Sequence, residues 1–144
     1  MSDPYGLARF VEAQERTYSG ALGELRAGRK RSHWMWFVFP QFDGLGSSGM
    51  SKRFAITSLD EAAAYLAHPV LGPRLVECAD AVLQIAGRSA TDIFGSPDDV
   101  KLRSSATLFA AISPEDSVFH RILAQYFQGK PDEVTLRLIG KKQA

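Results

Sequence analysis

Hydrophobic residues recur every three or four positions along most of the chain, which is the spacing of one face of an α-helix. This spacing predicts a first amphipathic helix over about residues 4–27. Asp3 followed by proline has the chemistry of a helix start, and Gly28 that of a helix end. Gly20 and Gly23 weaken the second half of this helix and favour a break or kink there.

A second block of helical spacing begins at Ser58 and continues almost to the end of the chain. Within it, Ser96 and Ser113 are each followed by proline and acidic residues, a typical helix start. The helix over 97–111 is apolar on more than one side, so we expect it to be central and largely buried. The pattern places helices at 60–67, 71–86, 97–111, after Ser113 and at 131–139, with a short turn after Ser89.

The segment 28–49 interrupts this pattern. Its apolar run, 34–39, is rich in aromatic residues and too short for periodicity to separate a buried strand from a buried helical turn. A small hairpin with 54–57 is the most that the sequence allows in extended structure. We therefore predict a mainly α protein, a single multihelical domain over 1–144 with about six or seven helices and at most a minor extended segment near 34–39 and 54–57.

Composition narrows the class of protein further. Of 144 residues, 45% are hydrophobic and 23% charged, which is ordinary for a globular protein, and the formal net charge is +1. That balance argues against broad adhesion to nucleic acid or membranes. No apolar run approaches the roughly 18 residues of a membrane span, and the N-terminus lacks the pattern of a leader, so we expect a cytoplasmic protein.

Metal and cofactor chemistry find little support in the sequence. The single cysteine, Cys78, lies in a helical apolar pattern and is expected in the core. The three histidines have no ligand-like spacing, so we predict no metal site. The string Gly44 to Gly49, which includes Ser47, matches G-x-G-x-x-G, but the strand before it and the repeated βα units of a dinucleotide fold are missing. We predict a loop there and no cofactor.

The best candidate site combines the segment 30–41 with the helix over 97–111. Consecutive cations at 29–31 can hold an anion, and the nearby tryptophans can stack on a ring. Asp98, Lys101 and Ser105 share one helix face, which would form a cleft with that segment if it points inward. His33 is the candidate catalytic acid or base. The candidate ligand-binding residues are Lys30, Ser32, Trp34, Trp36, Gln41, Lys101, Arg103 and Ser105.

This site would suit a small anionic or nucleotide-type ligand, and two alternatives stay open beside it. In the first, the aromatic segment 34–42 forms an exposed patch for a partner protein or for homodimerisation. In the second, the cations of 26–31 bind nucleic acid, against which the near-neutral charge argues. A further interpretation is structural, because cations just beyond a helix C-terminus are favourable on their own account.

Several motifs together resemble one bacterial family. They are Ser-His-Trp-Met-Trp-Phe-Val-Phe-Pro-Gln at 32–41, Gly-Leu-Gly-Ser-Ser at 44–48, Tyr-Leu-Ala-His-Pro-Val-Leu-Gly-Pro-Arg-Leu at 65–75 and Ile-Phe-Gly-Ser-Pro-Asp-Asp-Val-Lys-Leu-Arg-Ser-Ser-Ala-Thr-Leu-Phe at 93–109. The chain is similar over nearly its whole length to a domain of unknown function (DUF 1810). The resemblance implies a mainly helical domain. It implies no activity, so no catalytic residue is carried over from it.

Overall fold

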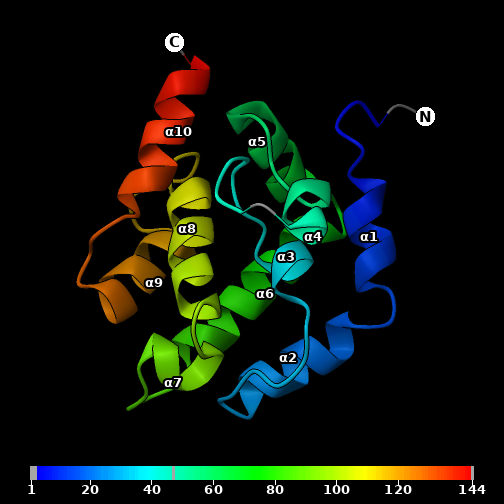
Figure 1. Ribbon diagram of the computed structural model, residues 1–144. Helices are drawn as coiled ribbons and strands as arrows, with labels where there is room; N and C mark the ends of the chain where they lie inside the picture. The colour runs from blue at the N-terminus through cyan, green and yellow to red at the C-terminus, as the bar shows by residue number, and fades with distance from the viewer. Residues whose placement is uncertain (1–2, 47, 144) are drawn as a thin grey trace.

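The computed structural model describes residues 3–46 and 48–143, and within them the chain forms ten helices and no strand (Figure 1). The mainly α prediction is confirmed, whereas the predicted number of about six or seven helices is wrong. The helices are α1 (Ala8–Gln14), α2 (Tyr18–Arg26), α3 (Met35–Val38), α4 (Gly49–Arg53), α5 (Leu59–Ala67), α6 (Leu71–Leu83), α7 (Ala90–Phe94), α8 (Asp98–Ala110), α9 (Val118–Phe127) and α10 (Glu133–Gln143).

The first predicted helix is two helices, because the chain tightens between them. The amide of Thr17 donates to the carbonyl of Gln14, and its hydroxyl donates to the carbonyl of Ala13 at 2.8 Å. The break therefore falls before the two glycines, which both lie inside α2, and the prediction of a break at Gly20 and Gly23 is wrong. Gly28 ends α2 in the left-handed region with φ of 86°, as predicted.

Helix starts follow serine chemistry, but not always at the predicted serine. Ser58 and Ser89 cap α5 and α7 through their side-chain oxygens, and both lie where the pattern predicted a helical segment to begin. By contrast, α8 begins after Pro97 with no side-chain cap, and α9 is capped by Ser117. The sequence therefore pointed to the wrong capping residue at Ser96 and Ser113, since neither serine lies directly before the first helical residue.

The ambiguous segment 34–39 forms a single helical turn, α3, rather than a strand. The extended pairing that the structure does contain is one parallel bridge between Phe42 and Ile56. The amide of Asp43 donates to the carbonyl of Ile56 at 2.8 Å. A hairpin consists of two antiparallel strands joined by a short turn. Here α4 lies between Phe42 and Ile56 in the sequence, and the two residues pair in parallel, so no hairpin forms.

The glycine string has a structural explanation on either side of Ser47, which lies outside the described residues. Gly44 has φ of 103°, and a Cβ there would lie 3.2 Å from Leu138 of α10. A Cβ at Gly46 would lie 2.4 Å from the Ser51 hydroxyl. These glycines let the loop pass close to α10 and α4.

The long helix α8 occupies the centre of the helical core and packs against α5, α7, α9 and α10 (Figure 1). A row of aromatic rings crosses the interior from α1 to α9, with centroid separations of 5.0, 5.5 and 5.4 Å. Edge-to-face and tilted contacts of this kind add to the burial of the rings. The row consists of Phe10, Tyr65, Phe109 and Phe119. Cys78 is buried beside it, as predicted.

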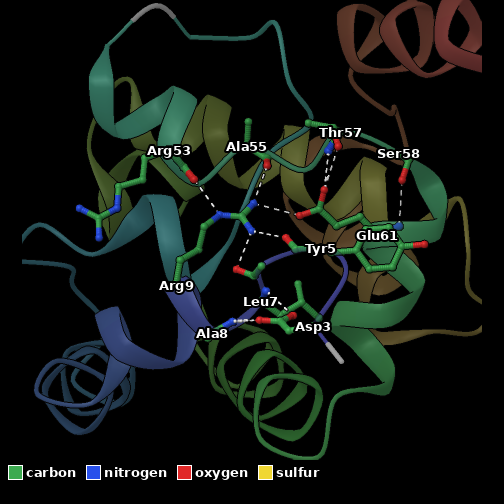
Figure 2. Close-up of polar contacts among 11 residues, drawn as sticks. Asp3, Tyr5, Leu7, Ala8, Arg9, Arg53, Ala55, Thr57, Ser58 and Glu61 are labelled. Carbon is green, nitrogen blue, oxygen red and sulfur yellow. Dashed lines mark hydrogen bonds and ion pairs between the residues drawn. The ribbon is translucent and has the colours of Figure 1, made fainter. Parts of the chain in front are cut away.

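Arg9 joins the N-terminal segment to residues 53–61, which are distant from it in sequence (Figure 2). Its guanidinium forms an ion pair with Glu61 of α5 at 2.9 Å, and the Glu61 side chain is only 3% exposed. Thr57 donates to the other Glu61 oxygen through its amide and its hydroxyl. The remaining Arg9 hydrogen bonds go to the carbonyl oxygens of Tyr5, Gly6, Arg53 and Ala55.

Across residues 3–46 and 48–143, none of the helices combines the length and the apolar character that a membrane span requires.

Candidate functional site

Two lysines from different parts of the chain converge on one carboxylate. The amide of Lys30 donates to the carbonyl of Ile93 at 2.7 Å, which holds the loop after α2 against the end of α7. The Lys30 ammonium then lies 2.7 Å from one oxygen of Asp98, and the Lys101 ammonium lies 3.3 Å from the other. Lys30, Asp98 and Lys101 form what we call the lysine–aspartate cluster, whose formal charge is +1.

Each ammonium of this cluster also lies over an indole ring. Lys30 is 5.1 Å from the ring centroid of Trp34, and Lys101 is 5.0 Å from that of Trp36. Cation–π contacts at such distances contribute about 0.5–2 kcal/mol, and more as water is excluded. Trp34 is 1% exposed, whereas Trp36 is only partly buried. The two lysines are therefore held by aromatic faces as well as by charge.

Several hydrogen-bond donors in this region have no acceptor among the residues that the structure describes. An ammonium has three N–H groups. Lys30 uses two, on Asp98 and on the carbonyl of Ser32 at 2.6 Å, and Lys101 uses one. In the described part of the chain, the Trp36 indole nitrogen is the one buried side-chain polar atom without a partner. A buried donor without an acceptor is uncommon and calls for an explanation.

Glu24, in the last turns of α2, organises the loop that carries Lys30. Its carboxylate accepts hydrogen bonds from the Arg31 amide at 2.6 Å, the Ser32 amide at 2.9 Å, the Ser32 hydroxyl, and the Trp34 indole N–H at 3.0 Å. Partial burial alone would raise the pKa of Glu24, but these donors outweigh it and lower the pKa to about 2. The loop is thus fixed by one ionised carboxylate.

This carboxylate gives a pH-dependent stability. The pKa of Glu24 falls from its usual 4.5 to about 2 on folding, so its contribution is present above pH 4.5 and is lost as the pH falls towards 2. We expect the free energy of unfolding of the wild type to fall more steeply across that window than that of Glu24→Gln. The gain is modest because the group is largely solvated. Urea unfolding at a series of pH values measures both slopes, and equal slopes would contradict the prediction.

The cations on either side of Lys30 are accessible to solvent. Arg29 and Arg31 are exposed, and with Lys30 they line a hollow of about 440 Å³. Neither arginine side chain forms an ion pair or a hydrogen bond with any part of the chain that the structure describes. Three consecutive cations, one of them anchored by Asp98, therefore face one hollow.

The structure brings together only some of the predicted ligand-binding residues. Lys30, Lys101, Trp34 and Trp36 meet in and around the lysine–aspartate cluster. Ser32 is exposed on the adjoining loop, where it binds Glu24.

The contacts that the structure describes for the other predicted residues do not include the lysine–aspartate cluster. His33 is exposed, and no carboxylate in the described residues orients its ring. The carbonyl of Gln41 accepts from Ile56 at 2.9 Å. Arg103 donates to the carbonyls that precede α10, at Lys130 and Pro131, and Ser105 is buried within α8.

The sequence did not point to Glu24, and it placed Asp98 on the cleft face of the helix over 97–111 without a partner from another segment, although each residue leaves a signal. A carboxylate near the C-terminus of a helix faces the negative end of the helix dipole, so Glu24 stands in an unfavourable place unless it has another partner. Asp98 lies three residues before Lys101, a spacing at which side chains meet on a helix. Neither signal identifies the partner that is distant in sequence, which is Lys30 for Asp98 and Trp34 for Glu24.

Of the three aromatic residues considered for an exposed patch over 34–42, two are buried. Trp34 is 1% exposed and Phe42 is 5% exposed, so both belong to the core. Only Trp36 of the three reaches the surface. The reason is that α3 turns Trp34 inward towards Phe39 and Phe94, at 6.3 and 6.5 Å between centroids.

Metal ligands do not gather in the described parts of the chain, residues 3–46 and 48–143. No three His, Cys, Asp or Glu side chains there are placed to hold an ion together. The donors around the lysine–aspartate cluster are N–H groups, which bind anions rather than metal ions.

The fold and the cluster define an all-helical protein with a cationic loop anchored to its central helix. The chain belongs to the family described as a protein of unknown function (DUF1810), whose model matches residues 4–139. The resemblance carried by the sequence motifs is thereby confirmed.

A solved structure shares this fold. The chain is similar to the conserved hypothetical protein Rv1873 from Mycobacterium tuberculosis, with 54% sequence identity and a TM-score of 0.94. The match covers 96% of this chain and 99% of that one. None of the curated proteins matches the chain.

Proposed function

We propose that this protein binds a small anionic molecule, such as a phosphorylated metabolite or a nucleotide, at the surface formed by the loop 29–31 and the Lys101 side of α8. The observation that carries the proposal is the hollow of about 440 Å³ lined by Arg29, Lys30 and Arg31. Guanidinium groups bind phosphate and carboxylate through bidentate hydrogen bonds, and ammonium groups bind them as point charges.

The lysine–aspartate cluster supports this function by positioning the cations in advance. Asp98 takes up one unit of charge and leaves a net positive centre. Lys30 is 7% exposed in its side chain and is held on four sides, by Asp98, Ser32, Ile93 and the Trp34 ring. Binding a ligand to side chains that are already fixed costs less conformational entropy.

Trp36 supports the ring-bearing members of this ligand class. It is partly exposed and carries Lys101 over its ring. An accessible aromatic face next to cations is the arrangement on which nucleobases stack. His33, exposed on the same loop, is the group we propose to donate a further hydrogen bond to the bound anion.

The test is a thermal-shift and fluorescence titration with inorganic phosphate, pyrophosphate and nucleoside mono- and triphosphates. A ligand at one hundred times its dissociation constant stabilises the folded state by about 2.7 kcal/mol, so a specific probe raises Tm in a saturable way. We expect Lys101→Ala to weaken that binding about tenfold, because a hydrogen bond to a charged group contributes about 1.5–3 kcal/mol.

Lys52→Ala is the matched control. Lys52 is an exposed lysine of α4 and lies outside the cluster, so its removal tests the effect of one lost charge alone. Its dissociation constants should equal those of the wild type. The proposed function is wrong if no probe shifts Tm, or if Lys101→Ala and Lys52→Ala bind the probe equally well.

A further inference from the structure

The groove between α2 and α6 is a second candidate site, separate from the lysine–aspartate cluster. It encloses about 690 Å³, within the roughly 300–1,000 Å³ of small-molecule sites. In Figure 1 the two helices lie next to each other, and their packing is direct. Gly28, at the end of α2, has φ of 86° and forms part of the groove wall.

Part of the groove lining is apolar. Pro73, Val76, Ala81 and Ile85 contribute to it, and Val76 is 36% exposed although it lies on a helix that packs into the core. These side chains offer apolar surface on which a ring can pack.

One end of the groove is cationic. Arg88 lines both the groove and a neighbouring hollow of about 480 Å³, which Arg29 also lines. Its guanidinium lies beside Gly28, where a Cβ would be 3.7 Å from Nε, and its only hydrogen bond in the described residues is to the Gly28 carbonyl at 3.5 Å. Asp92 also lines that hollow and accepts a hydrogen bond from the Ser89 amide, whereas neither Arg29 nor Arg88 forms an ion pair in the described residues.

The acidic side of the groove is partly occupied. Glu77 accepts a hydrogen bond from the Tyr18 hydroxyl and lies 3.7 Å from Arg26. Asp80 has no side-chain partner in the part of the chain that the structure describes. Its carboxylate can accept a hydrogen bond from a ligand N–H.

From this arrangement we infer that the groove binds a small molecule with a flat apolar ring, an anionic group at Arg88 and an N–H donor facing Asp80. The anionic group of the ligand binds Arg88 and Arg29, its ring packs on Val76, and its N–H group donates a hydrogen bond to Asp80. The site shares Arg29 with the proposed anion site, but the groove itself is lined by the end of α2 and by α6, and its existence does not depend on that proposal.

The experiment is an NMR titration of the full chain, with amide shifts followed for 4-aminophenylphosphonate, phenylphosphonate and aniline. The first probe has all three features, the second lacks the donor and the third lacks the anion. We expect saturable shifts at the amides of Gly28, Val76 and Ala81 with the first probe. Binding should be weaker with the second probe and at least tenfold weaker with the third, which corresponds to about 1.4 kcal/mol.

Variants separate the groove from the rest of the surface. Arg88→Ala should weaken 4-aminophenylphosphonate at least tenfold, and Val76→Asp should do so independently by placing a charge under the ring. Both residues are exposed, so both variants should fold. Lys52→Ala should leave the dissociation constant unchanged, since Lys52 does not line the groove.

Three results would overturn the inference: no saturable shift in the groove, shifts confined to the loop 29–31 and α8, or equal affinity in wild type and Arg88→Ala. A failure of the proposed function would look different. In that case Lys101→Ala and Lys52→Ala would behave alike with phosphates, while the groove probe still bound.

Discussion

Replacing Arg9 by alanine is expected to lower the free energy of unfolding by about 3 kcal/mol or more, the range for removing one partner of a buried ion pair. The Glu61 carboxylate, 3% exposed, would remain in the interior with only Thr57 as a donor. Four backbone carbonyl oxygens would lose the same guanidinium at once (Figure 2). Urea unfolding followed by circular dichroism measures the change.

Arg53→Ala is the matched control for this variant. Arg53 lies in the same region, but its side chain is exposed, points away from Glu61 in Figure 2 and lies over the ring of Phe54. We expect its loss to cost less than about 1 kcal/mol, as for most surface substitutions.

Arg9→Lys should fall between the two arginine-to-alanine variants. A lysine can pair with Glu61, but it cannot reproduce the planar set of five donors that reaches several carbonyls. If Arg9→Ala destabilised the protein no more than Arg53→Ala, the connecting role of Arg9 would be wrong.

The two tryptophans should differ in how strongly their substitution destabilises the protein. Trp34→Ala is expected to cost about 3–5 kcal/mol, as for other large aromatic side chains removed from a core. Trp34 is 1% exposed, packs on Phe39 and Phe94, and donates to Glu24. Its removal would leave a cavity and take one donor from the carboxylate that holds the loop.

Trp36→Phe is the conservative counterpart. The Trp36 indole nitrogen is buried without an acceptor, so replacing the indole by an apolar ring removes an unsatisfied donor. We expect its stability to stay within about 1 kcal/mol of the wild type, with the ring still available to Lys101. This variant also leaves Trp34 as the sole indole.

Fluorescence then reports the burial of Trp34 directly. The emission of Trp36→Phe should be blue-shifted and resist quenching by iodide, because Trp34 is 1% exposed. Trp34→Phe, which retains Trp36, should be quenched more readily. Equal quenching in the two variants would contradict the burial pattern, and equal stability of Trp34→Ala and Trp36→Phe would contradict its energetic consequence.

The local parts of the fold were accessible from the sequence because local chemistry decides them. Ser58 and Ser89 cap their helices with the side-chain oxygen, and Gly28 ends α2 with a positive φ. The apolar stripe of α6 and the central position of α8 follow from the spacing of hydrophobic residues. The break between α1 and α2 was not predicted. It is formed by hydrogen bonds from Thr17 to the carbonyls of Ala13 and Gln14, which helix propensities do not indicate.

The candidate site was predictable in part. The sequence placed Lys30, Trp36 and Lys101 in one hypothesis for two reasons. Cations and indoles are dense at 30–36, and a lysine is unusual on an apolar helix. It also included Arg103 and Gln41, which form hydrogen bonds with the chain before α10 and with Ile56. Spacing along a helix says which residues share a face, but not which segment packs against that face.

The sequence by itself determined the helical class, most helix ends and the segment where cations and indoles gather, because these depend on residues close together in the chain. Only the tertiary structure decided that Asp98 joins Lys30 to Lys101, that Glu24 binds the loop as far as Trp34, and that Trp34 is buried while Trp36 is not. Each of these depends on the packing of α2, α3, α7 and α8, and contacts between distant segments leave no periodic signal in a single sequence.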